Sequence, residues 1–95
     1  MKKPVKLKVG KADPHLRGLS KGAKDTAQWI SEDVAYIVNF GNDNPFVNGP
    51  VFHVPAGGSV DSGPIRAGIE EKVYHYDLRG ANSASGGDPD VEILP

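Results

Sequence analysis

A chain of 95 residues fits a single domain, and its 12 glycines and 8 prolines exclude long helices and favour short strands joined by turns. With 38% hydrophobic and 24% charged residues, the composition is that of a globular protein rather than a disordered one. The absence of cysteine excludes disulfides, zinc–thiolate sites, a thiol nucleophile and any copper site that needs a thiolate.

The net charge of −1 hides a strong division along the chain. Residues 1–24 hold eight basic residues and one acid, a balance of +7, whereas residues 25–95 hold three basic residues and eleven acids, a balance of −8. Such a division is typical of an interaction arm, for which the candidate contacts are Lys3, Lys6, Lys8 and Lys11. The favoured interpretation is that the basic segment folds onto the acidic remainder of its own chain.

Neither end of the chain shows a membrane or secretion signal. The opening Met-Lys-Lys is not followed by an apolar run of signal-peptide length, and no stretch approaches the roughly 20 apolar residues of a membrane span. We therefore expect a soluble, cytoplasmic protein without membrane contact, or an extracytoplasmic one if a signal peptide has been removed from this sequence.

The apolar pattern predicts short strands in chain order. In residues 4–9, valine and leucine alternate with two lysines, a period of two that is typical of a half-buried strand. Residues 34–40 form the strongest strand, and because Ile37 is apolar on the opposite face, we expect both faces to be covered. Residues 10–25 are predicted to be a loop with one short helical turn near residues 15–19. The other expected strands are residues 26–30, 51–54, 59–65, 73–78 and 90–94.

About seven or eight short strands with little helix predict an all-β fold, a single Greek-key β-sandwich. The predicted domain spans residues 1–95, with residues 1–25 as a basic N-terminal strand and loop and residues 26–95 as the sandwich body. A sandwich this small needs most of its aromatic side chains inside, so the following are predicted to be core: Tyr36, Phe46, Phe52, Tyr74 and Tyr76.

Several motifs follow one another in an order that carries a family resemblance. A strand with Trp29 precedes a polar turn and a strand ending in Asn39-Phe40. The later motifs are Asn44-Pro-Phe46, Val51-Phe-His-Val-Pro-Ala-Gly-Gly-Ser-Val60, Ser62-Gly-Pro64, Tyr74-His-Tyr76 and Asp88-Pro-Asp-Val-Glu-Ile93. Over roughly residues 26–95 the chain resembles small bacterial domains of the cupredoxin-like β-sandwich family, the plastocyanin and azurin type of fold.

The resemblance implies the fold without the copper. In copper-binding members a histidine follows the strand that ends here at Phe40, and here Phe46 stands near that position. A cysteine closes the Tyr-x-Tyr strand, where this chain has Leu78, and the loop from Arg79 to Pro89 lacks the histidine and methionine that follow. A blue-copper centre needs the thiolate, so no cofactor is expected.

A surface metal site is the alternative that the remaining ligand types allow. If Phe52 faces the core, His53 points outward, and His75 and Asp77 point outward from their strand in the same way. Adjacent strands would then bring His53 and His75 together, and with Asp77 they form the candidate metal ligands. The competing interpretation is exposed histidines without a ligand.

Two other chemistries are weaker. Asp88, Asp90 and Glu92 share a strand face and offer oxygen ligands for calcium, but a solvated acidic face is favoured because the EF-hand spacing is absent. The serines in glycine-rich turns lack a nucleophile-elbow or phosphate-loop pattern, so we expect no enzyme, with a hydrolase as the alternative. They are Ser59, Ser62, Ser83 and Ser85.

The predicted function is therefore non-catalytic. We expect a metal-free, cupredoxin-like module that binds an unknown protein partner or self-associates through edge strands or through its oppositely charged parts. The basic segment offers weak phosphate contact as a further alternative, but it has no interleaved aromatic residues, and the pI of about 6.3 argues against nucleic acid as a partner.

Overall fold

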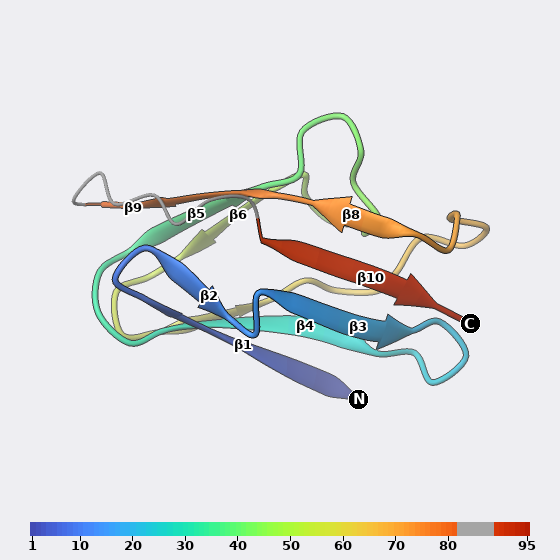
Figure 1. The fold of residues 1–95 in the computed structure, drawn as a ribbon, viewed down its shortest axis with the longest axis horizontal. Helices are drawn as coiled ribbons and strands as arrows, with labels where there is room; N and C mark the ends of the chain where they lie inside the picture. Colours follow the sequence, from blue (N-terminus) through green and yellow to red (C-terminus); the bar gives the residue numbers. More distant parts are fainter. Residues whose placement is uncertain (82–88) are drawn as a thin grey trace.

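The computed structural model describes residues 1–81 and 89–95, whose regular structure consists of ten β-strands (Figure 1). They are β1 (Lys2–Lys8), β2 (Lys11–Asp13), β3 (Leu16–Ser20), β4 (Thr26–Ser31), β5 (Tyr36–Asn39), β6 (Val51–Val54), β7 (Ser59–Asp61), β8 (Val73–His75), β9 (Asp77–Gly80) and β10 (Asp90–Leu94). The predicted all-β class is confirmed, with ten strands where seven or eight were expected. The described residues contain no helix that is long and apolar enough to cross a membrane.

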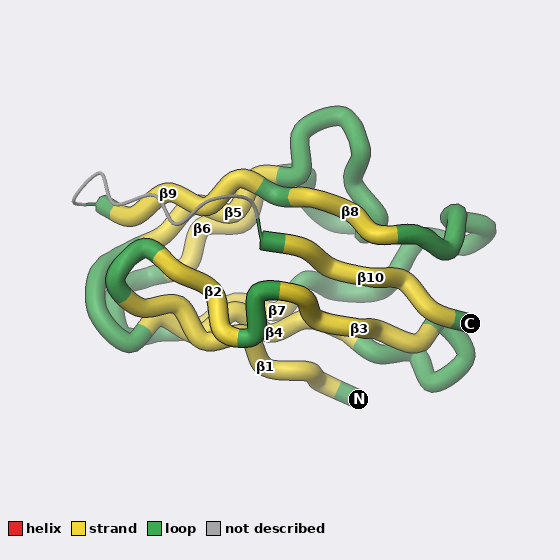
Figure 2. Tube along the Cα trace, in the orientation of Figure 1, coloured by secondary structure: helices red, strands yellow, loops and turns green. Residues whose placement is uncertain are grey.

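The strands form two layers. One sheet, which we call sheet I, has the order β2-β1-β4-β7, and two further groups have the orders β3-β10-β8 and β6-β5-β9. Strands β8 and β9 are separated only by Tyr76, whose N–H donates to the Pro89 carbonyl at 3.0 Å, so these two groups continue one another and together make sheet II. Figure 2 shows β1, β4 and β7 in one layer and β5, β6, β8 and β9 in the other.

The segment 10–25 crosses from one sheet to the other, and its prediction as a loop with a helical turn is wrong. Strand β2 pairs with β1 in sheet I, and β3 begins two residues after Asp13–Pro14 in sheet II, where it runs parallel to β10. The pairing with β10, rather than any alternation within the segment, makes β3 a strand. At Gly18 a Cβ would stand 3.2 Å from Leu94 Cδ1, the end of an exposed side chain on β10.

Four other predictions needed correction at their ends or faces. Strand β5 is shorter than residues 34–40, β7 is shorter than residues 59–65, and the expected strand 73–78 is interrupted at Tyr76. The expectation that β5 would be covered on both faces is wrong, because the Ile37 side chain remains 41% exposed.

The interior is built around the single tryptophan. Trp29 is fully buried in β4, and its ring centre lies 5.0–6.1 Å from those of Phe40, Phe46, Phe52 and Tyr76. All seven aromatic residues of the chain are buried, which confirms the prediction for the five that were expected in the core. Tilted and edge-to-face pairs such as these contribute beyond the area that they bury.

Candidate functional site

The outer face of sheet I carries a cluster of lysines. Alternation along β1 turns Lys6 and Lys8 outward, and the register places Lys6 opposite Asp13 and Lys8 opposite Lys11 on β2. We call the outward side chains of sheet I the lysine face: Lys2, Pro4, Lys6, Lys8, Lys11, Asp13, Thr26, Gln28, Ile30, Ser59 and Asp61. Four lysines and two aspartates give this face a balance of +2.

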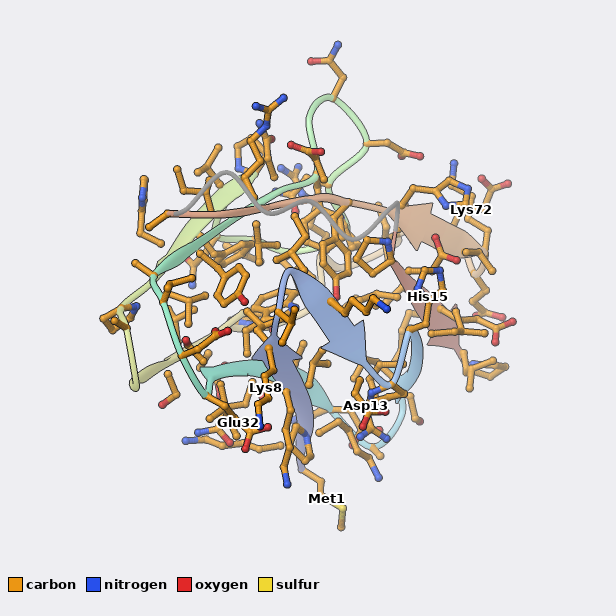
Figure 3. All side chains as sticks on the ribbon, turned by 60° about the vertical axis from the view of Figure 1, so that its left-hand side comes forward. Met1, Lys8, Asp13, His15, Glu32 and Lys72 are labelled. Atoms are coloured by element: carbon orange, nitrogen blue, oxygen red, sulfur yellow. The ribbon has the colours of Figure 1, made fainter. Side chains whose placement is uncertain are left out.

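The basic segment is part of the sandwich, because β1 lies between β2 and β4. Some of its charge is compensated within the chain, since the Met1 amino group lies 3.5 Å from Asp25 and Lys2 Nζ lies 3.8 Å from Asp61. In contrast, Lys6, Lys8 and Lys11 form no ion pair with any residue that the structure describes. The strand residues of the lysine face therefore keep a positive balance; Figure 3 labels Lys8 of this face together with Asp13 on β2 and the exposed Glu32 that follows β4.

Lys3 differs from the other three candidate lysines. Its side chain lies on the inward-facing side of β1 and is half-buried near Asp25. The pKa of Asp25 is held below its ordinary value mainly by the hydrogen bond from the Ser20 N–H, and the charge of Lys3 acts in the same direction. Lys3 thus stabilises a buried carboxylate of its own chain and stands apart from the outward lysines.

The outer face of sheet II has the opposite balance. We call its outward side chains the acidic face: Leu16, Gly18, Ser20, Ile37, Asn39, Val51, His53, Val73, His75, Asp77, Arg79, Asp90, Glu92 and Leu94. Three carboxylates and one arginine give −2 with neutral histidines. The face also holds five large hydrophobic side chains that are 36–45% exposed, namely Leu16, Ile37, Val51, Val73 and Leu94.

The structure does not bring the two candidate histidines together. His53 on β6 lies opposite Ile37 on β5, which lies opposite Arg79 on β9, so a whole strand separates His53 from β9. His75 lies on β8, in the other strand group of sheet II, and its register partner is Asp90 on β10. The expected juxtaposition of His53 and His75 on neighbouring strands is therefore wrong, because it assumed a strand order that sheet II does not have.

The carboxylates near these histidines have other partners. His75 Nδ1 contacts Asp90 Oδ1, and Asp77 Oδ2 accepts a hydrogen bond from Arg79 Nε at 3.2 Å. Within the described ranges, no three histidine, aspartate or glutamate side chains gather in a metal-binding group. Asp90 and Glu92 are half-buried on β10, whereas Asp88 of the calcium hypothesis lies outside the described residues.

The positions aligned with copper ligands do not fit the metal. Leu78 and Phe46 are both fully buried, and Phe46 packs against the ring of Phe40 at 5.5 Å. The polar groups beside them are the Trp29 N–H and the Tyr76 hydroxyl, which bond to each other at 3.3 Å. Neither Leu78 nor Phe46 offers a donor atom that copper could bind.

The two described serines of the four considered for a hydrolase lie in different environments. Ser62 is fully buried, and its hydroxyl accepts the Ala27 N–H and donates to the Gly63 carbonyl, both at 2.9 Å. This hydroxyl continues the pairing of β4 and β7 beyond the end of the strand. Ser59 is exposed on β7, and Ser83 and Ser85 lie outside the described residues.

Sequence reasoning missed a groove at one end of sheet I. It has a volume of about 600 Å³ and is lined by Lys21, Lys24, Thr26 and residues 63–68. The basic residue that completes it, Arg66, is more than forty positions from Lys21 along the chain, and no periodicity or motif in the sequence connects the two.

No protein-family model and no curated protein matches this chain.

Proposed function

We propose that the protein is a non-catalytic, cupredoxin-like binding module that self-associates, with the lysine face of one copy against the acidic face of another. The observation that carries this proposal is the opposite charge of the two faces, +2 on sheet I and −2 on sheet II. Complementary charge steers two surfaces into encounter and fixes their orientation.

The apolar side chains of the acidic face supply the attraction that charge alone does not. Ile37 and Val51 lie on the neighbouring strands β5 and β6, beside Asp77 and Arg79 of β9. Burial of apolar surface contributes about 25 cal/mol for each Å² removed from water. The long methylene stems of lysine can cover such apolar surface while their ammonium groups reach carboxylates.

The geometry also predicts the form of the assembly. The two faces lie on opposite sides of the sandwich, so a contact between unlike faces leaves one lysine face and one acidic face open on the pair (Figures 1 and 2). Such heterologous contacts add further copies unless the rotation closes a ring. We expect the mean mass to rise steadily with protein concentration and not to stop at a dimer.

The cupredoxin-like part of the proposal rests on the order of the sequence motifs over residues 26–95, with which the two-layered arrangement of strands is compatible. The chain crosses from sheet I to sheet II between β2 and β3, and β1–β4 and β3–β10 are parallel pairs in an otherwise antiparallel arrangement. Leu78, at the position that the resemblance aligns with a cysteine, is core. These features support a sandwich of that family that keeps the frame without the metal.

Sedimentation velocity over a range of protein concentrations tests self-association. At about 10 mM salt, where the screening length is about 30 Å, we expect the mean mass to grow with concentration, and at about 1 M salt we expect dissociation. A monomer under both conditions at high concentration would overturn self-association.

The variant Lys11→Glu tests the assignment of the faces. Lys11 faces Lys8 across β1 and β2, so the change replaces a like-charge pair with an opposite one and keeps the charge of Lys8, which also lowers the pKa of Asp33. It lowers the balance of the lysine face from +2 to zero, and we expect association at low salt to be lost. Lys24→Glu, in the β3–β4 turn, is the matched control; equal effects of the two variants would contradict the proposed interface.

A further inference from the structure

The groove at the end of sheet I lies between two segments that are distant in sequence. The turn between β3 and β4 provides Lys21 and Lys24, β4 begins with Thr26, and residues 63–68 after β7 form the opposite wall. Its volume is about 600 Å³, and it is open to solvent, since Lys24, Pro64 and Arg66 are exposed.

The lining is cationic. Lys21, Lys24 and Arg66 contribute three positive charges, and no carboxylate lines the groove. Lys21 is already compensated, because its Nζ lies 2.9 Å from Glu71 Oε2 and donates to the Ile69 carbonyl at 3.2 Å. Lys24 and Arg66 form no ion pair with a residue that the structure describes. The groove therefore presents two uncompensated cations.

Arg66 is held in place by one edge of its guanidinium group. Its Nε donates to the carbonyl of the buried Phe46 at 2.9 Å, and its backbone N–H donates to the Pro45 carbonyl at 2.9 Å. Within the described residues, its two Nη atoms make no hydrogen bond. A planar guanidinium fixed in this way suits a carboxylate and loses little freedom on binding it.

The wall that carries Arg66 is anchored and partly apolar. Ile65 forms a bridge with Phe46, and the Pro64 carbonyl accepts the Val47 N–H at 2.9 Å. Gly63, at the start of the wall, has a φ of +74°, and a side chain there would meet Asn48 at 2.2 Å. The backbone of this wall is thus fixed without a ligand, and Pro64 and Ile65 offer it carbon surface.

We propose that this groove binds a small organic carboxylate. The carboxylate lies between Arg66 and Lys24, and a short apolar chain or ring lies against Pro64 and Ile65. One carboxylate is matched by the planar guanidinium group of Arg66 together with the ammonium group of Lys24. The apolar wall contributes to binding only if the anion also has a hydrocarbon part.

A titration with octanoate, followed by amide resonances of the intact protein, tests this assignment. We expect saturable shifts at Gly63, Arg66 and Gly68, which surround the groove. Octanamide lacks the charge and acetate lacks the chain, so both should bind about tenfold more weakly or worse, the equivalent of about 1.4 kcal/mol. Shifts that do not saturate, or equal binding of octanoate and octanamide, would overturn the proposal.

Two variants locate the carboxylate. Arg66→Gln should weaken octanoate by about tenfold or more, because hydrogen bonds between charged groups are the strong ones. Arg66 also donates to the carbonyl of Phe46, so its variant changes a structural contact as well. Lys24→Gln provides a second measurement, because the ammonium group of Lys24 makes no structural contact within the described part of the chain. We expect Lys24→Gln to lower the affinity for octanoate about threefold, as for a more exposed charge pair. Lys8→Gln on the lysine face is the control and should bind as wild type does. Undiminished binding by Lys24→Gln would refute the site.

Discussion

The hydrogen bond between Trp29 and Tyr76 joins the two sheets inside the aromatic core, and Tyr76→Phe removes it with the least change of shape. The Trp29 Nε1–H donates to the Tyr76 hydroxyl at 3.3 Å, and these side chains are 0% and 2% exposed. In the variant the indole N–H stays buried and loses its acceptor. A buried donor without a partner is the expensive outcome of losing a hydrogen bond.

The expected cost follows from burial and length together. Leaving a buried donor unsatisfied costs about 1–3 kcal/mol, and the long bond at Trp29 places this case at the lower end. We therefore expect Tyr76→Phe to lower the free energy of unfolding by about 1–2 kcal/mol. For a domain of this size the melting temperature falls by roughly 4–8 °C for each kcal/mol.

Urea unfolding followed by tryptophan fluorescence measures the effect, because Trp29 is the only tryptophan. Tyr74→Phe is the matched control: its hydroxyl donates to the Glu70 carbonyl at a shorter 2.7 Å, but that residue is exposed and water can replace the donor. The control should cost no more than about 1 kcal/mol. If the shorter bond at Tyr74 costs more than the bond at Tyr76, burial is not what decides the energy and the reasoning fails.

Two titrations provide further predictions. Burial raises the pKa of Tyr76 to about 12 from an ordinary 10.0. The contribution of Tyr76 to stability is therefore complete below pH 10 and is lost as the pH rises towards 12. In that window the free energy of unfolding of Tyr76→Phe should fall less with pH than that of wild type. The pKa of Asp33 is lowered, mainly by the hydrogen bond from the Val9 N–H at 2.8 Å and also by the Tyr36 hydroxyl, so its contribution is present above the ordinary carboxyl pKa and is lost as the pH falls through the lowered value. Melting temperatures of Asp33→Asn should therefore change less between pH 7 and pH 3 than those of wild type, and an unchanged slope would contradict the assignment.

The sequence predicted strands wherever one face of the strand is buried. The alternation in β1 and the β-branched run in β5 each mark a buried face, and both strands were found. Strand β3 could not be found in this way, because only Leu19 faces the core and the segment is extended through its parallel pairing with β10. A partner that lies about seventy residues away leaves no local signal.

The candidate sites divide in the same way. The outward direction of Lys6, Lys8, His53 and His75 follows from the period of two, and the structure has it. Which outward residues become neighbours depends on strand order and register. The expected pairing of the two histidines failed on strand order, and the groove at Arg66 depends on contacts between loops that no periodicity describes.

The register of β1 and β2 places two lysines opposite each other, which favours the proposed self-association. Lys8 and Lys11 lie directly opposite each other and are both exposed, and like charges in that position destabilise a sheet. A partner surface with carboxylates removes this repulsion, so the isolated chain carries a cost that an assembly relieves. Lys11→Glu separates the two effects, because it changes the pair and keeps the charge of Lys8. It should raise the monomer's free energy of unfolding by about 0.2–1 kcal/mol, as expected for an opposite-charge pair across strands, and at the same time weaken association. A variant that is less stable and still associates would show that the lysines serve the fold of the monomer and not a contact between copies.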